Sequence, residues 1–284
     1  MLVNFNRMLR DAQVGRYAVG SFNVYNYETM KGVVEAAREA GDKPVIVAFG
    51  AKYLSSMSLD DAHALASSLS DGAGVPVCLH LDHCKDTDTI YRAIRAGFTS
   101  VMYDGSALPF GQNADNTRRV CDVAHACGVS VEAELGSLAT GEASNEGGAS
   151  DKQVYTDPEK AGEFVEHTGA DALAVSVGTV HGLYKGTPNI RLDILEAIRA
   201  ACPVPLVLHG GSGVPAATIR DCIARGVCKI NVNTEISVHA VEQSARMIVQ
   251  EKKPHLSVLA LAQQGFVKDV VKKYIGFFEG TGSV

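Results

Sequence analysis

Three histidines of this sequence, His83, His181 and His209, each stand at or just beyond the end of a short run rich in β-branched residues. Imidazole nitrogens suit zinc, cobalt and iron, whereas calcium and magnesium prefer oxygen ligands. A catalytic zinc site commonly has three protein ligands and one open position. If the three runs are strands that end at one edge, the histidines could form such a site. For each histidine taken alone, an ordinary hydrogen-bonded side chain is the simpler interpretation.

Carboxylates stand close to these histidines in the chain. Asp82 directly precedes His83, and Glu132 and Glu134 lie two residues apart in a further run. Neighbours in an extended chain point to opposite sides, so one residue of the Asp82–His83 pair could face a metal while the other faces a substrate. A carboxylate beside a polarised carbonyl could move a proton to or from a hydroxyl. Of the two glutamates, one could support a ligand and the other bind the metal, or both could form ion pairs inside the site.

Two turns rich in glycine and amide side chains precede helical patterns, HGGSGVP at 209–215 and NVNTE at 231–235. Backbone N–H groups at such turns bind phosphate. The glycines of one turn alone could simply make a tight bend, but the two turns together predict a phosphate site. A metal that polarises a carbonyl, an anchored phosphate and a carboxylate base would suit the cleavage of a carbon–carbon bond.

The elements that must position these residues alternate regularly along the chain. Helical patterns such as TMKGVVEAAREAG and DTDTIYRAIRAG lie between eight candidate strands, at 17–24, 43–49, 75–82, 99–105, 129–136, 170–178, 204–211 and 227–233. Eight strand–helix units predict a (β/α)8 TIM barrel, here one domain over residues 1–284, with a doubly wound sheet as the alternative. Barrel active sites form at the carboxyl ends of the strands, where the polar residues of this chain collect.

Composition narrows the classes of function. The 284 residues are 46% hydrophobic, enough for a sizeable core, and the net charge is −6 without basic runs. Nucleic acids and anionic membranes are therefore not expected as partners. No apolar stretch reaches the ~18 residues of a membrane span, and the amino terminus does not resemble a signal peptide. The seven cysteines form no CxxC motif, which is typical of free thiols in the cytoplasm.

Five motifs carry a resemblance to a known family. HLDH, EAELG, GTVHGLYKG, LVLHGGSG and KINVNTE resemble the motifs of class II, zinc-dependent fructose- and tagatose-bisphosphate aldolases, in the same order, between Tyr17 and Glu235. Their fold is a (β/α)8 barrel, here with an additional C-terminal helix. They cleave a ketose 1-phosphate reversibly to dihydroxyacetone phosphate and an aldehyde. The resemblance also implies a monovalent cation, Na⁺ or K⁺, and a homodimer or homotetramer.

The resemblance further implies a role for individual residues. His83, His181 and His209 would hold Zn²⁺, and Glu134 would approach the metal when it shifts. Asp82 would move the proton of the hydroxyl on the aldehyde half, and Glu142 the carbon-bound proton of dihydroxyacetone phosphate. The residues expected to bind the substrate are Asn23, Gly182, Gly210, Gly211, Ser212, Asn231, Asn233 and Thr234.

Two positions depart from the family pattern. The family has a serine or threonine after the second strand that helps to hold the distal phosphate, and PVIVAFG has Gly50 there. Near the C-terminus it has Asp-Pro-Arg, whose arginine reaches a neighbouring subunit's distal phosphate, and KKPHLS has His255. Imidazole does not reproduce the arginine fork. The alternative substrate is therefore a ketose 1-phosphate with a non-phosphate end, such as 6-deoxy-6-sulfofructose 1-phosphate, with Lys52 or His255 as candidate contacts.

Three other functions remain open at this point. A Schiff-base aldolase needs a lysine in the mouth, and only Lys229 is a candidate, although a packed or paired role suits it better. A non-catalytic aldolase-like subunit is disfavoured by the complete histidine set and Glu142. A metal-dependent hydrolase would use barrel histidines but would not require the phosphate turns.

Overall fold

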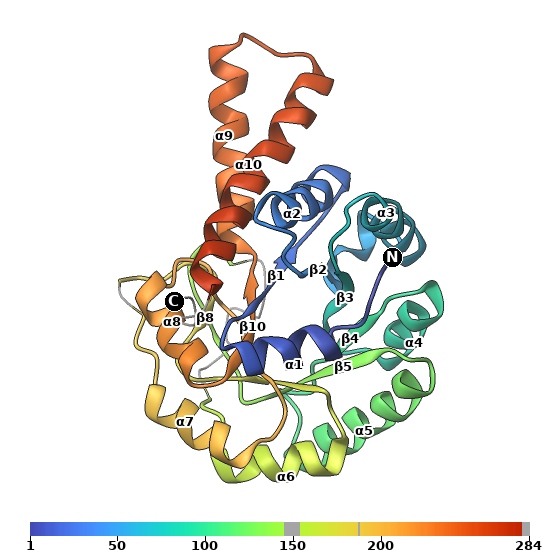
Figure 1. Cartoon of the computed structure of the whole chain (residues 1–284), viewed down its shortest axis with the longest axis vertical. Helices are drawn as coiled ribbons and strands as arrows, with labels where there is room; N and C mark the ends of the chain where they lie inside the picture. Colours follow the sequence, from blue (N-terminus) through green and yellow to red (C-terminus); the bar gives the residue numbers. More distant parts are fainter. Residues whose placement is uncertain (145–153, 187, 280–284) are drawn as a thin grey trace.

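The computed structural model describes residues 1–144, 154–186 and 188–279, and it contains the predicted (β/α)8 barrel. Eight parallel strands close in the order β1-β10-β9-β7-β5-β4-β3-β2, with helices around them (Figure 1). The barrel strands are β1 (Val19–Asn23), β2 (Val45–Gly50), β3 (Val77–Cys84), β4 (Ser100–Tyr103), β5 (Ser130–Leu135), β7 (Ala172–Val175), β9 (Leu206–Leu208) and β10 (Val227–Val232). The alternative of a doubly wound sheet is wrong, because β1 pairs with both β2 and β10 and closes the sheet.

The helices follow the predicted pattern of one helix after most strands. They are α1 (Asn6–Gly15), α2 (Tyr27–Glu39), the 3₁₀ turn η1 (Ala51–Ser55), α3 (Leu59–Asp71), α4 (Thr87–Ala96), α5 (Phe110–Ala126), α6 (Pro158–Thr168), α7 (Leu192–Ala201), α8 (Ala216–Ala224), α9 (Thr234–Gln250) and α10 (Leu256–Phe278). Local signals set their ends. Asn26 caps α2 in a reciprocal capping box with Thr29, and Gly97 ends α4 with a φ of 103°.

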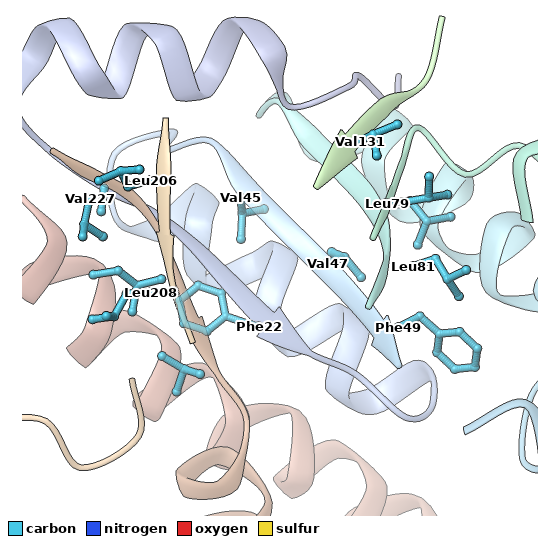
Figure 2. Packing of buried hydrophobic residues seen from close by; sticks show 14 of the residues in the cluster. Phe22, Val45, Val47, Phe49, Leu79, Leu81, Val131, Leu206, Leu208 and Val227 are labelled. Atoms are coloured by element: carbon cyan, nitrogen blue, oxygen red, sulfur yellow. The ribbon is translucent and has the colours of Figure 1, made fainter. Parts of the chain in front are cut away.

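Each barrel strand presents one face to the helices and the other to the interior. Outward side chains such as Phe22, Val47 and Leu79 are apolar and form the main core with the helices (Figure 2). The interior has a small apolar cluster at its amino-terminal end, where Phe5 and helix α1 close the barrel. Towards the carboxyl ends of the strands the inward residues become polar. The alternation of period two therefore separates a stabilising face from a face that can hold a site.

Two features were not predicted. Helix α1 precedes the first strand and lies across one end of the barrel (Figure 1). The predicted strand 170–178 is also too long, because β7 stops at Val175. His181 instead lies on a separate short strand, β8 (Val180–His181), which pairs with β6 (Ala139–Thr140). The loops after β5 and β7 thus form a small two-stranded sheet of their own above the barrel.

The predicted additional C-terminal helix is part of a larger feature. Helices α9 and α10 form an antiparallel pair, and the turn between them projects away from the barrel (Figure 1). The second half of α10 returns to the barrel, where Tyr274 and Phe278 are buried. Tyr274 also accepts a hydrogen bond from the backbone N–H of Gly213 at 2.8 Å, which ties α10 to the loop after β9. No helix among the described residues is long and apolar enough to cross a membrane.

Candidate active site

The three predicted histidines meet at the carboxyl ends of the strands. His83 comes from β3, His181 from β8 and His209 from the residue after β9, and their ligand atoms lie within 4.8 Å of one another. The Nε2 atom of His83 is 2.8 Å from Nδ1 of His209. The His181 ring lies 4.9 Å from the His83 ring and 6.0 Å from the His209 ring, between centroids. The grouping predicted from separate strand ends is therefore present.

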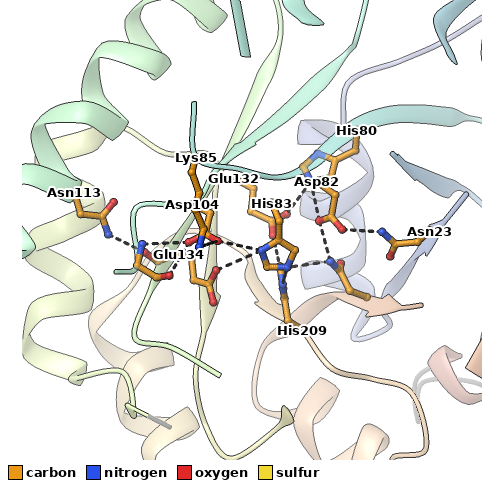
Figure 3. Close-up of polar contacts among 12 residues, drawn as sticks. Asn23, His80, Asp82, His83, Lys85, Asp104, Asn113, Glu132, Glu134 and His209 are labelled. Carbon is orange, nitrogen blue, oxygen red and sulfur yellow. Dashed lines mark hydrogen bonds and ion pairs between the residues drawn. The ribbon is translucent and has the colours of Figure 1, made fainter. Parts of the chain in front are cut away.

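The backbone at His83 corrects the expectation for the Asp82–His83 pair. His83 has a φ of 46°, and the pairing of β3 with β4 shifts register between Leu81 and Cys84. A bulge of this kind turns a side chain away from the strict alternation of a strand. Asp82 and His83 therefore both face the mouth instead of opposite sides of the strand (Figure 3). A non-glycine residue with positive φ is uncommon, and such strain clusters at functional sites.

Asp82 is a buried carboxylate with two amide donors. Asn23 Nδ2 donates to its Oδ2 at 2.9 Å, and Asn231 Nδ2 donates to its Oδ1 at 3.2 Å. Burial disfavours the ionised form, but the charges of His83 and Lys229 outweigh it and hold the pKa of Asp82 well below its usual range. Asp82 is thus an ionised carboxylate with a fixed orientation next to the histidines. Asn23 reaches this carboxylate.

Glu132 lies beneath the histidines and is fully buried. Its Oε1 is 2.7 Å from Nε2 of His209, and its Oε2 is 2.8 Å from Nζ of Lys229. The first contact orients the His209 ring and leaves Nδ1 for a metal, as carboxylates behind metal-binding histidines commonly do. The structure therefore combines the two interpretations left open for this glutamate. Lys229 is a paired residue, as the sequence analysis favoured, and not a free amine in the mouth.

Two further carboxylates approach His83 from its other side. Nδ1 of His83 is 3.4 Å from Asp104 Oδ2 and 3.8 Å from Glu134 Oε2 (Figure 3). Burial and then Asp104 raise the pKa of Glu134 well above its usual value. Burial opposes protonation of His83, but Asp82 and Asp104 outweigh it and raise the pKa of His83 to about 10. The surroundings therefore stabilise a positive charge where the histidines meet.

This donor set fits a zinc ion. Three imidazoles on separate elements match the usual catalytic zinc set, and the carboxylates behind and beside them supply negative charge. His83, Asp104 and Glu134 form a second, more oxygen-rich group whose ligand atoms also lie within 4.8 Å of one another. A role for Asp104 was not expected from the sequence. Its position at the end of the predicted strand 99–105 was the available signal.

The predicted phosphate turns form a small pocket beside the histidines. It is lined by Gly182, His209, Gly210, Ser212, Asn231, Asn233 and Thr234. Gly210 has a φ of 69°, and a Cβ there would collide with the backbone oxygen of Val180. Helix α9 begins at Thr234, so its positive end faces the pocket. Two predicted substrate residues, Asn23 and Gly211, do not line this pocket.

Glu142 lies apart from the buried cluster. Its side chain is 58% exposed, and its carboxylate is 3.6 Å from Nζ of Lys185. The Glu142 backbone N–H donates to the Leu183 oxygen at 2.9 Å, which attaches this loop to the segment after β8. The structure thus brings the Glu142 backbone near His181 but does not bring its carboxylate against the histidines. Residues 145–153 of the predicted loop 137–153 lie outside the described residues.

The two positions that depart from the family pattern, Gly50 and His255, lie in different parts of the structure. Gly50 ends β2 and pairs in register with Asp82, so it lies at the mouth. An added Cβ at Gly50 would lie 2.9 Å from the ring of Tyr53. Lys52 is exposed, with its Nζ 5.2 Å from the centre of the Tyr53 ring. His255 caps α10 at the turn that projects from the barrel, away from its own chain's site, so its contact with the distal group of a neighbouring subunit's substrate stays a prediction.

Two tyrosines at the mouth were not foreseen. Tyr25 follows β1 and Tyr53 lies in η1, and their rings pack edge to face with 4.9 Å between centroids. Tyr25 OH donates to Oδ1 of Asn233, and Asn233 Nδ2 is 3.5 Å from Tyr53 OH. The pair therefore connects Gly50 with a residue that lines the phosphate pocket. Single aromatic residues in loops carry no sequence signal of such a role.

Comparisons with known proteins agree with this geometry. A protein-family model described as fructose-bisphosphate aldolase class-II matches residues 3–283. The chain is 39% identical over 251 residues to the Escherichia coli K12 protein YdjI, which covers 88% of this chain and 87% of YdjI. It is 37% identical over 273 residues to the sulfofructosephosphate aldolase of Alkalicoccus urumqiensis, covering 95% and 94% of the two chains.

A solved structure shows the same fold. The crystal structure of the YdjI aldolase of Escherichia coli K12 superposes with a TM-score of 0.86, at 35% identity, over 98% of this chain and 97% of that one. The family match spans the strands that carry the histidines, Asp82 and the predicted phosphate turns. The chain therefore belongs to the class-II fructose-bisphosphate aldolase family.

Proposed function

We propose that the protein is a zinc-dependent lyase that reversibly cleaves a ketose 1-phosphate to dihydroxyacetone phosphate and an aldehyde. The observation that carries this proposal is the meeting of three histidines, an ionised Asp82 and the phosphate pocket within one mouth. His83, His181 and His209 would hold Zn²⁺, with Glu134 as a ligand that approaches when the metal shifts. Zinc, when bound, polarises the substrate carbonyl. The catalytic unit is one barrel domain over residues 1–284.

The side chains of the protein would handle the substrate and its protons. Gly182, Gly210, Gly211, Ser212, Asn233 and Thr234 would hold the phosphate and the nearby hydroxyls. Asp82, oriented by Asn23 and Asn231, accepts the hydroxyl proton of the carbon that becomes the aldehyde, and the adjacent carbon–carbon bond breaks. Glu142 then protonates the carbon released on the dihydroxyacetone phosphate half. Because Glu142 is 58% exposed, its loop must close over the substrate for this step.

The test of this proposal combines turnover with metal content. The purified chain is assayed alone for cleavage of fructose and tagatose 1,6-bisphosphates and close analogues, before and after removal of metal with a chelator. We expect one zinc per subunit, loss of turnover with the metal and recovery when zinc is restored. Turnover that survives chelation, or substrate trapped by borohydride, would favour a Schiff-base enzyme instead. A chain that binds zinc but turns over no ketose 1-phosphate would be a non-catalytic subunit, and release of free phosphate would indicate a hydrolase.

A second candidate concerns the far end of the substrate. With its phosphate in the pocket and the cleaved bond at Asp82, an extended substrate must continue across the mouth towards β1 and β2. At the end of β2 this chain lacks the serine or threonine hydroxyl of the family pattern. Gly50 stands there instead and leaves space that the Tyr53 ring occupies. A relative 37% identical to this chain is a sulfofructosephosphate aldolase. These observations favour a substrate such as 6-deoxy-6-sulfofructose 1-phosphate, with Lys52 as a candidate contact.

This second candidate is tested by substrates that differ only at carbon six. The value of kcat/KM is compared for a phosphate, a sulfonate, a carboxylate and a hydroxyl at that position. We expect the sulfonate or another non-phosphate end to exceed the phosphate. Gly50→Ser, which introduces a hydroxyl and displaces Tyr53, should shift the ratio towards the phosphate. A wild-type preference for the bisphosphate would exclude the altered end but leave the aldolase proposal intact.

Assembly and ions extend the proposal. Six of the fourteen exposed large hydrophobic residues of the described chain lie on the arm formed by α9 and α10: Val241, Ile248, Val249, Leu256, Val258 and Leu261. Such a concentration favours a homodimer or homotetramer in which the arm is covered. His255 could then reach the site of a neighbouring subunit.

We also propose a bound Na⁺ or K⁺ near the phosphate turns, and a cytoplasmic location in which the seven free cysteines stay reduced.

A further inference from the structure

A fully buried lysine lies beneath the site, and none of the proposed reaction steps involves its side chain. Lys229 is on β10, pairs in register with Val19 of β1 and Val207 of β9, and is 0% exposed. Among the described residues no other lysine or arginine is buried. Placing an ammonium group inside a protein is costly unless it is paired, and an apolar side chain would pack at this position without that cost. The presence of a lysine therefore calls for an explanation.

The contacts of Lys229 place it between the metal site and the base. Nζ is 2.8 Å from Glu132 Oε2, and it donates to Asn231 Oδ1 at 2.6 Å. Glu132 in turn contacts His209 Nε2 at 2.7 Å, and Asn231 Nδ2 donates to Asp82 at 3.2 Å. The five residues form one continuous buried chain of polar contacts. Lys229 is its centre, with one branch to a metal-site histidine and one to the base.

Each branch depends on the charge and donor character of the lysine. Glu132 is 0% exposed, and the ammonium is the cation that balances it while its other oxygen orients His209. Asn231 can present either its oxygen or its amide nitrogen to Asp82. Because Lys229 has only donors, it takes the Asn231 oxygen and leaves the NH₂ group for the Asp82 carboxylate. A neutral side chain at 229 would remove both constraints.

The same contacts separate Lys229 from the substrate. Its Nζ is held by a hydrogen bond to Asn231 and an ion pair with Glu132, and Lys229 is not among the residues that line the phosphate pocket. It therefore does not touch the reacting atoms. A role through other residues is what this placement allows.

We propose that Lys229 is the positioning residue of the site, which orients His209 through Glu132 and Asp82 through Asn231. This inference rests on the proposed function, because it takes His209 as a zinc ligand and Asp82 as the base. One lysine thereby sets both the metal affinity and the efficiency of the hydroxyl-proton transfer. The effect on His209 passes mainly through Glu132 and the effect on Asp82 through Asn231, so mutation of Glu132 separates the two.

The experiment compares Lys229→Met, Glu132→Gln and the double variant. Zinc affinity is measured by competition with a chromophoric chelator, and kcat for cleavage is measured at saturating zinc. The visible spectrum of the cobalt-substituted proteins reports the geometry of the metal ligands. Lys43→Met is the matched control, because it removes a half-buried lysine from an ion pair with Glu279 outside the mouth.

We expect each of the two single variants to weaken zinc binding by about 10- to 100-fold and to change the cobalt spectrum. The double variant should bind zinc nearly as Glu132→Gln does, since the 2.7 Å contact of Glu132 is the main path from Lys229 to His209 and the contact of Asn231 Nδ2 with His209 Nε2 is longer, at 3.5 Å. At saturating zinc, kcat should fall by about tenfold or more in both variants that lack Lys229, and by less in Glu132→Gln. Lys43→Met should match the wild type in all three measurements.

Several results would overturn the inference. One is a folded Lys229→Met protein with wild-type zinc affinity and a kcat within about twofold of the wild type. Another is a loss of thermal stability alone, which would make Lys229 a structural residue. If Lys229→Met does not fold because Glu132 is left unpaired, the double variant, which has no unpaired charge, carries the test. A wild-type protein that neither binds zinc nor cleaves any ketose 1-phosphate when zinc is supplied would instead refute the proposed function.

Discussion

The half of the mouth built on β3, β5 and β10 differs from the half built on the loops after β5 and β7 in how its polar groups are held. In the strand half, Asp82, Glu132 and Lys229 are at most 1% exposed and each has a buried charged or amide partner. In the loop half, Glu142 and Lys185 are 58% and 80% exposed and pair with each other at 3.6 Å. His181 comes from the loop half and meets the strand half at the histidine cluster.

This difference suggests a division of labour. A base and metal ligands must be preorganised, because a misplaced charge cannot stabilise the reacting group. A proton carrier on a loop must let substrate enter and must then close, so it cannot be equally buried beforehand. The strand half should therefore tolerate little change, whereas the loop half should affect turnover without affecting stability. Each of the following predictions tests one side of this comparison.

The largest effect is expected for His209→Ala in the strand half. It removes one proposed zinc ligand and leaves Glu132 without its histidine partner. Zinc content should fall from one per subunit to near zero, and kcat should fall by about 10³-fold or more, since a Lewis acid contributes several kcal/mol. Metal analysis and steady-state cleavage check this. Normal zinc content in the variant would contradict the assignment of His209.

Glu142→Gln should have nearly as large an effect on rate, but of a different kind. Loss of a positioned proton carrier lowers kcat by about 10²- to 10⁴-fold. Because the carboxylate is exposed, the free energy of unfolding should change by less than about 0.5 kcal/mol, and zinc content should stay at the wild-type level. Stability, metal content and turnover are measured on one preparation. A clear loss of stability or zinc would mean that the loop half is not separate from the strand half.

The buried histidine of the strand half should appear in the pH dependence of stability. Burial, and then the Lys229 ammonium, lower the pKa of His80 from 6.5 to about 4. Between pH 6.5 and 4, His80 is protonated in the unfolded chain but stays neutral in the folded protein. The free energy of unfolding should therefore fall by about 3 kcal/mol as the pH drops from 6.5 to 4, and be restored as it rises.

The measurement is denaturant unfolding of the metal-free protein across this pH range, with His80→Gln for comparison. His80 contacts Ser100 at 2.8 Å, a hydrogen bond that glutamine can also make, and Glu132 and Asp82 lie 3.7 and 3.9 Å from its Nε2. The wild type should lose more stability between pH 6.5 and 4 than the variant. Equal slopes for both proteins would show that His80 is not the residue responsible.

The smallest effect is expected for Lys185→Met in the loop half. An exposed ion pair such as Lys185–Glu142 contributes about 0–1 kcal/mol, because water screens it. The unfolding free energy should stay within about 0.5 kcal/mol of the wild type, measured at low and high salt. A large, salt-dependent loss would indicate that the loop half is more rigidly held than its exposure suggests.

Periodicity and residue type predicted much of this molecule. Alternating strands and helices predicted the barrel, and polar residues at the strand ends predicted that His83, His181 and His209 would meet. These inferences succeed because strand ends share one rim of a closed parallel sheet, so position along a strand translates into position in space. The HGGSG and NVNTE turns likewise predicted the pocket, since glycines and an adjacent helix start are local features.

The regular pattern of strands and helices could not predict the places where the backbone departs from that pattern. The positive φ of His83 brings it to the same side as Asp82, and no residue type in HLDH signals this bulge. The predicted strand 170–178 shortens to β7, and His181 lies on the separate strand β8, which depends on pairing with β6, a non-local contact. The Tyr53 ring can pack against the end of β2 only because position 50 is a glycine, since a Cβ there would lie 2.9 Å from the ring.

The sequence by itself therefore determined the fold class and the meeting of the three histidines, Asp82 and the glycine-rich turns at one rim, because each follows from local pattern and the common rim of the barrel. Only the tertiary structure decided how these residues are linked. Glu132, Lys229 and Asn231 lie on β5 and β10, which are not neighbours in the barrel, yet their side chains meet across its interior. Contacts across a closed sheet depend on strand stagger and side-chain packing, which a one-dimensional pattern does not contain.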